Sequence, residues 1–143
     1  MAVKVYNINR LSFILLGVPI DSGFGESDFL VWQPEGPLYG DKAGADGEVC
    51  RYATNERRAT LELHLMQSSD QNAKLSAMVA AGLLLNNGSD VGPLNIKDNN
   101  GVTDILAGSA WVEGFPEWKA SKEVQEIVWK IRMVWDVCLI GGN

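Results

Sequence analysis

Residue types that react with substrates or bind metals are scarce in this sequence. Its 143 residues include one histidine, His64, and two cysteines, Cys50 and Cys138. The cysteines lie outside any Cys-x-x-Cys or Cys/His spacing, so a zinc site is not indicated, and we expect free, buried thiols in a reducing compartment. His64 stands beside Glu62 and near no motif, which is typical of a strand residue that faces solvent or a partner.

Clusters of positive charge and long apolar runs are also missing. Eighteen acidic residues against twelve basic ones give a formal net charge of −6, and the one basic pair, Arg57-Arg58, is expected at the solvated end of a turn. Tight binding to nucleic-acid phosphates is therefore not expected. The longest apolar run, FILLGVPI at 13–20, is too short to span a bilayer, and the first residues lack a secretory pattern. We expect no membrane insertion.

Catalytic and cofactor motifs are not found either. There is no Gly-x-Ser-x-Gly, His-Glu-x-x-His, Walker or dinucleotide fingerprint, and GFGESD at 23–28 lacks the third glycine of a phosphate loop. Asp41, Asp46 and Glu48 invite a calcium interpretation, but Ala43 and Ala45 stand where a calcium loop needs oxygen ligands. We expect no enzyme activity, no cofactor and no metal.

What the sequence does contain is an acidic region and a glycine-rich one. From 21 to 48 there are seven carboxylates and one base, Lys42, which indicates a solvated face or a surface whose negative potential is functional. GPLYGDKAGADGEV at 36–49 holds four glycines. Such a segment either approaches a ligand closely or is a loop that something else orders.

The composition is that of one soluble domain, 1–143, made mainly of strands. We expect strands at 10–20, 28–33, 47–53 and 59–67. The first is rich in β-branched and aromatic residues, which favours burial on both faces or a subunit contact. In the fourth, Leu61, Leu63 and Leu65 alternate with Thr60, Glu62 and His64, so the leucines should face the core.

One helix is expected around 69–86. Ser68 and Gln71 have the spacing of a capping box, and Gly88 could take a left-handed C-cap. The apolar stripe of this helix comprises Leu75, Met78, Val79, Gly82 and Leu83.

Two further elements are expected towards the C-terminus. Residues 93–113 read as a hairpin around Asn100-Gly101, in which Gly108 and Ala110 leave one face thin for another backbone. Residues 123–140 read as one strand, far longer than the usual length of about five or six residues, so part of it should pair beyond the subunit. Trp32, Trp111 and Trp118 are left unassigned. We expect Trp129 and Trp135 of the strand at 123–140 in the core. The apolar face of that strand is Ile127, Trp129, Ile131, Met133, Trp135, Val137 and Leu139.

The order of these segments resembles the tail tube proteins of contractile-tailed bacteriophages, of the small single-domain type. The resemblance covers nearly the whole chain. It rests on GADG (44–47) leading into a strand, on RRATLELHLMQSSDQNAKLSAM (57–78), and on FPEWKASKE (115–123) before the final strand. The acidic segment 21–35 and the tryptophan-rich C-terminal half depart from the family pattern.

This resemblance implies a structural virion protein of mainly β (α+β) class, a β-sandwich or barrel-like subunit with one flanking helix. Six subunits would form a ring, and stacked rings would form the inner tube through which double-stranded DNA is ejected without tight binding. Implied partners are further copies of itself and the tail sheath, tape measure, baseplate and tail terminator proteins. The protein would be located in the virion tail and assembled in the host cytoplasm.

Three features of the sequence agree with this interpretation: the overlong strand, the net negative charge of a channel along which DNA must slide, and a glycine-rich loop without ligand chemistry. We interpret the loop, about 36–47, as an assembly arm that is mobile in the free subunit and ordered by the neighbouring ring. Asp28 and Glu62 are the lumen candidates, with Lys130 and Arg132 paired to acids. The candidates for inter-subunit contacts are Leu38, Tyr39, Gly40, Asp41, Lys42, Gly44 and Asp46.

Two alternatives stay open. A tube subunit of a phage-derived contractile particle without DNA would have the same sequence features. A monomeric β-sandwich module that binds carbohydrate through exposed tryptophans belongs to a different class, and electron microscopy of the purified protein would separate it from a tube subunit.

Overall fold

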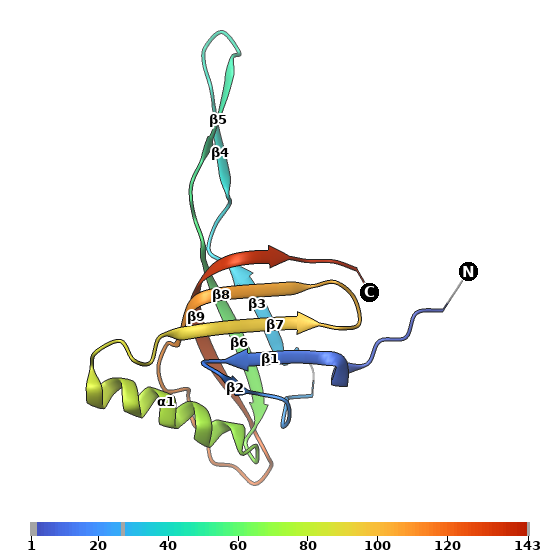
Figure 1. Cartoon of the computed structure of the whole chain (residues 1–143), viewed down its shortest axis with the longest axis vertical. Helices are drawn as coiled ribbons and strands as arrows, with labels where there is room; N and C mark the ends of the chain where they lie inside the picture. Colours follow the sequence, from blue (N-terminus) through green and yellow to red (C-terminus); the bar gives the residue numbers. More distant parts are fainter. Residues whose placement is uncertain (1–2, 27, 143) are drawn as a thin grey trace.

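Antiparallel β-structure with a single α-helix makes up the computed structural model, which describes residues 3–26 and 28–142 (Figure 1). The predicted class, mainly β with one helix and a sandwich-like arrangement, is confirmed. In chain order the elements are the 3-10 turn η1 (Ile8–Arg10), β1 (Leu11–Leu15), β2 (Val18–Pro19), β3 (Leu30–Pro34), β4 (Tyr39–Ala43), β5 (Val49–Ala53), β6 (Arg58–Met66), α1 (Gln71–Leu85), β7 (Gly92–Asp98), β8 (Asp104–Val112) and β9 (Glu126–Leu139).

The long strand β9 joins the two halves of the main sheet, whose order is β2-β1-β7-β8-β9-β6-β3. Its residues 126–134 pair with β6, and its residues 131–139 pair with β8. The sheet bends at this strand, so that β6 and β3 cross the direction of β8, β7 and β1 (Figure 1). The prediction of a single overlong strand is confirmed, although it runs over 126–139 and not 123–140. Because nearly every residue has a strand partner inside the chain, the length alone does not require a second subunit.

The core lies between the crossing parts of the sheet and under α1. Leu61, Leu63 and Leu65 of β6 are fully buried, as their alternation predicts. Trp129 is buried as well, with 2% of its surface exposed. The other buried apolar residues are Phe13, Leu15, Ile20, Ala59, Leu75, Val79, Leu94, Ile96, Ile105, Ala107, Ala110, Val112, Ile127, Ile131 and Met133.

The predicted apolar face of β9 is wrong in its last third. Between the pairs Leu106↔Val137 and Ala107↔Trp135, β9 has one extra residue, Asp136. This bulge turns the side chains that follow it in β9 to the opposite face. Val137 and Leu139 are therefore exposed, at 50% and 53%, and Cys138 packs against the core instead. Trp135, at the shift, is only partly buried.

Among the described residues, it is the Asp136 side chain and not another backbone that occupies the thin position at Gly108. The Asp136 carboxylate accepts the Gly108 N–H at 2.7 Å, and a Cβ at Gly108 would lie 2.7 Å from the same oxygen. Ala110, by contrast, is fully buried. The predicted hairpin itself is confirmed, with β7 and β8 joined through residues 99–103.

The segment 10–20 forms two short strands where one strand was predicted. Leu16 and Gly17, with φ of 52° and 80°, make a tight turn between β1 and β2. Positive φ at both positions is what a two-residue hairpin turn requires, and Gly17 takes it at little cost. Ile14 is 37% exposed, so this segment is buried on one face only.

Both predicted caps of α1 are wrong. Asp70 occupies the N-cap position without a side-chain bond, and the Ser69 hydroxyl accepts the Gln71 N–H at 3.2 Å. The helix ends at Asn86, which takes the left-handed conformation and donates its N–H to the Gly82 carbonyl. The predicted stripe is buried only in its first half, at Leu75 and Val79, whereas Leu83 is 71% exposed.

The two cysteines are free, as predicted, but Cys50 is exposed and Cys138 only half-buried. Burial raises the pKa of the Cys138 thiol.

Candidate assembly surface

The glycine-rich segment forms most of a β-hairpin that projects from the body of the molecule (Figure 1). β4 and β5 pair only with each other, in the register Tyr39↔Ala53 to Ala43↔Val49. The prediction of a loop over 36–47 is therefore wrong for residues 39–43. The turn is confined to 44–48, where the Gly44 N–H donates to the Glu48 carbonyl and Gly47 has a φ of 91°.

None of the strand residues in this hairpin is buried. A two-stranded hairpin without a covering layer is marginally stable in water. Cross-strand contacts stabilise it: the Arg51 guanidinium lies over the Tyr39 ring at 4.0 Å, and the Tyr52 ring lies so close to Gly40 that a side chain there would collide with it. Four large apolar side chains remain exposed on it, Leu38, Tyr39, Val49 and Tyr52.

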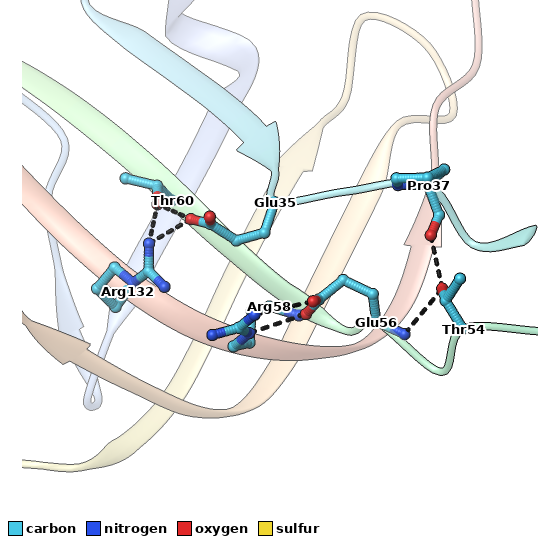
Figure 2. A network of polar contacts seen from close by, with 7 residues as sticks. All are labelled: Glu35, Pro37, Thr54, Glu56, Arg58, Thr60 and Arg132. Atoms are coloured by element: carbon cyan, nitrogen blue, oxygen red, sulfur yellow. Dashed lines mark hydrogen bonds and ion pairs between the residues drawn. The ribbon is translucent and has the colours of Figure 1, made fainter. Parts of the chain in front are cut away.

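A first polar cluster closes the base of the hairpin (Figure 2). The Thr54 hydroxyl donates to the Pro37 carbonyl at 2.6 Å. This bond joins the segment that enters the hairpin to the segment that leaves it. Glu56 accepts two hydrogen bonds from the Arg58 guanidinium, each of 2.9 Å, and a third from the Arg58 backbone N–H at 3.1 Å. A bidentate pair of this kind holds geometry better than a single contact.

A second cluster connects the strands below the hairpin (Figure 2). Arg132 on β9 forms an ion pair with Glu35, which directly follows β3, and donates to the Thr60 hydroxyl at 2.7 Å. Thr60 in turn donates to Glu35 at 2.8 Å. The predicted pairing of Arg132 with an acid is confirmed. Lys130 makes no ion pair with any residue that the structure describes, so its predicted pairing is wrong.

These hydrogen bonds lower the pKa of both carboxyl groups. Hydrogen bonds from Arg58 lower the pKa of Glu56 from 4.5 to about 2. The hydrogen bond from Thr60, together with the charge of Arg132, lowers the pKa of Glu35. Both groups are therefore anions at neutral pH and hold their arginine partners in place.

The structure gathers the predicted inter-subunit contact residues on one hairpin. All seven candidates for inter-subunit contacts lie on the hairpin: Leu38 before β4, Tyr39, Gly40, Asp41 and Lys42 within it, and Gly44 and Asp46 in the turn. The lumen candidates lie on β6 and just before its neighbour β3. Asp28 precedes β3, whereas Glu62 lies mid-β6 on the face away from the core, 3.5 Å from His64.

His64 and the pair Arg57-Arg58 make specific contacts that the sequence did not predict. His64 is flanked by two carboxylates, Glu62 at 3.5 Å and Glu126 at 3.4 Å. Arg57 stacks on the Trp135 ring at 4.6 Å, so neither it nor Arg58 is merely the solvated end of a turn. The sequence gives no signal for the anchoring acids Glu35 and Glu56. The partner of Glu35, Arg132, lies on another strand, and the partner of Glu56, Arg58, was expected at the solvated end of a turn.

In residues 3–26 and 28–142, no group of three or more His, Cys, Asp or Glu side chains could hold a metal ion. The single described α-helix is neither long nor apolar enough to cross a membrane. No protein-family model matches the chain, and no curated protein matches it significantly.

Proposed function

We propose that this protein is a structural subunit of a contractile phage tail tube and acts without catalysis. The observation that carries the proposal is the β4–β5 hairpin, which projects from the body, buries none of its strand residues and is anchored at its base by two polar clusters. An arm anchored at its base, with an exposed apolar surface, suits contact with another molecule.

The remaining surface supports self-association. Further large apolar side chains are exposed at the end of α1, where Leu83, Leu84 and Leu85 are 71%, 85% and 56% exposed. The short edge strands β2 and β3 leave two sides of the sheet open to pairing. Closed rings of identical subunits would cover such surfaces and edges.

In the proposed assembly, six copies form a ring and the hairpin of each ring contacts the next ring. The stacked rings form the inner tube for double-stranded DNA, surrounded by a tail sheath and built with tape measure, baseplate and tail terminator proteins. The same subunit architecture would serve a DNA-free contractile particle.

A carbohydrate-binding module has less support. Stacking on sugars needs exposed aromatic faces grouped together, but Trp129 is buried and Trp32 and Trp135 pack against the core. Trp118 alone among the tryptophans is largely exposed, at 68%.

Negative-stain electron microscopy of the purified full chain tests the proposal. We expect six-fold rings or hollow tubes, and the tubes should lengthen with protein concentration. A population of dispersed monomers at all concentrations, confirmed by sedimentation velocity, would overturn it.

A further inference from the structure

One edge of β9 is left without a strand partner and faces a cleft. β8 ends at Val112, and the last contact on that side is the Glu113 N–H donating to the Lys130 carbonyl at 2.9 Å. The N–H and C=O groups of successive strand residues point to opposite edges, so those of Val128 and Glu126 point the same way as the Lys130 carbonyl. No described residue pairs with them there.

The segment between β8 and β9 leaves this edge open. Residues 114–124 make no backbone hydrogen bond to β9 within the described chain, and they enclose with it a cleft of about 570 Å³. Phe115 and Val128 line the cleft with apolar surface, Glu113, Glu117 and Glu126 line it with carboxylates, and Lys119 and Lys130 line it with ammonium groups. It is therefore shaped for an extended chain that adds a strand to the sheet.

The cleft carries one more carboxylate than ammonium group, so its net charge favours a basic occupant. Lys119 already pairs with Glu117 at 3.5 Å, and Glu126 contacts His64. Glu113, at the start of the open edge, forms no ion pair with any described residue. A strand that brings one positive side chain to Glu113 would satisfy this carboxylate.

The N-terminal segment of this chain has those properties. From residue 3 to residue 20 it contains two basic residues, Lys4 and Arg10, and no acid. Val3 and Val5 alternate with Lys4 and are 91% and 76% exposed, so the segment has one uncovered apolar side. It contacts the body at Asn7, whose N–H donates to the Asn100 Oδ1 at 2.9 Å and whose carbonyl accepts from the Asn100 Nδ2 at 2.8 Å.

Beyond Asn7 the segment leads away from the molecule, on a side remote from the connection between β8 and β9 (Figure 1). It is therefore placed to reach another copy. We propose that residues 3–6 of one copy add an extended strand to the open edge of β9 at Glu126 and Val128 in a second copy, with Lys4 facing Glu113. The proposal deepens the proposed tube function by assigning one contact between its subunits.

A peptide probe tests this contact directly. The probe is a capped, fluorescent peptide with the sequence of residues 3–10, VKVYNINR, titrated into the full chain by anisotropy. The chain carries Val5→Asp, so that its own segments do not fill the cleft. We expect saturable binding, weakened at least about tenfold by Glu113→Lys in the protein. A peptide with Lys4→Glu should reverse that preference.

N-methylation separates strand addition from non-specific attraction. One peptide is methylated on the amides of Val3 and Val5, and a second on those of Lys4 and Tyr6. Only one of these sets points at β9, so one peptide should bind at least about tenfold more weakly than the other. Equal binding of the two, or no saturable binding by the parent peptide, would overturn the proposal. Tubes seen without peptide binding would refute this contact alone, and peptide binding without tubes would refute the tube function alone.

Discussion

The indole Nε1 of Trp129 on β9 donates a hydrogen bond of 2.9 Å to the Oδ1 of Asn72 in the first turn of α1. The Asn72 amide nitrogen donates in turn to the carbonyls of Met66 and Ser69, at 3.0 and 3.1 Å. One side chain thus joins the end of β6, the following turn and the buried indole. The helix is fixed on the sheet by this polar contact as well as by Leu75.

Asn72→Ala should therefore destabilise the protein by about 1–3 kcal/mol, because it leaves the N–H of a buried indole without its partner. Asn72→Asp keeps the acceptor for the indole but sets a carboxylate oxygen against the carbonyls of Met66 and Ser69, so it should also destabilise the protein. Lys74→Ala, at an exposed position of the same helix, is the control and should stay within about 0.5 kcal/mol of wild type. Urea unfolding measures all three. Equal stability of Asn72→Ala and the control would mean that water replaces the amide.

The register shift in β9 predicts opposite outcomes for two residues that a regular strand would place on the same face. Ile131→Asp puts a carboxylate into the fully buried core, which should cost several kcal/mol and yield insoluble or unfolded protein. Val137→Asp alters a side chain that is 50% exposed and should leave a folded protein with nearly unchanged stability. Circular dichroism and urea unfolding measure both. If Val137→Asp also fails to fold, the apolar face continues without a shift.

Sequence patterning predicts the parts of this fold that depend on neighbouring residues alone. The alternation of β6 and of the first half of β9 identifies their buried faces correctly. A bulge is set by the partner strand, so the reversal at Val137 has no signal in its own segment. Leu83 continues the helical stripe but remains exposed, because burial depends on what the helix packs against.

The candidate site also has a part that the sequence predicts and a part that it does not. Glycine spacing locates the projecting segment, yet it conceals a strand, in which the Tyr52 ring packs against Gly40. The anchor beneath it joins residues far apart in the chain. Glu35 and Arg132 are 97 positions apart, and no local pattern brings them together.

The carboxyl group of Glu56 should titrate far below an ordinary glutamate. Hydrogen bonds from Arg58 lower its pKa to about 2 in the folded protein, so its stabilising contribution is present above pH 4.5 and is lost as the pH falls towards 2. An NMR titration of the side-chain carboxyl carbon should show this midpoint. Arg58→Ala should move the midpoint back towards 4.5, whereas Lys122→Ala, on a distant exposed segment, should not. A wild-type midpoint near 4.5 would contradict the bidentate pair.

Removing the whole hairpin should abolish assembly and spare the fold. Deleting only Leu38–Gly44 would leave β5 without a partner, so we replace residues 38–53 with a two-residue Asn-Gly turn between Pro37 and Thr54, whose atoms already meet at 2.6 Å. We expect a soluble, folded monomer by circular dichroism and no tubes in micrographs. The double substitution Tyr39→Ala/Tyr52→Ala keeps the backbone and should shorten the tubes. Long tubes from the hairpin-less variant would exclude the hairpin as the contact between rings.

Glu62 tests whether the outer face of β6 and β9 lines the channel. In a ring of identical subunits, one substitution repeats in every copy, so weak contacts with DNA phosphates add along the tube and depend steeply on salt. Glu62 is half-exposed on this face, directly opposite Lys130, and Glu62→Lys would place two ammonium groups side by side. We expect the variant to form tubes that retain short double-stranded DNA at low salt and release it at high salt. Glu123→Lys, which makes the same change of charge at an exposed position before β9, is the control. Retention by neither variant, or by both equally, would place Glu62 outside the lumen, and loss of tubes in Glu62→Lys would place it between subunits.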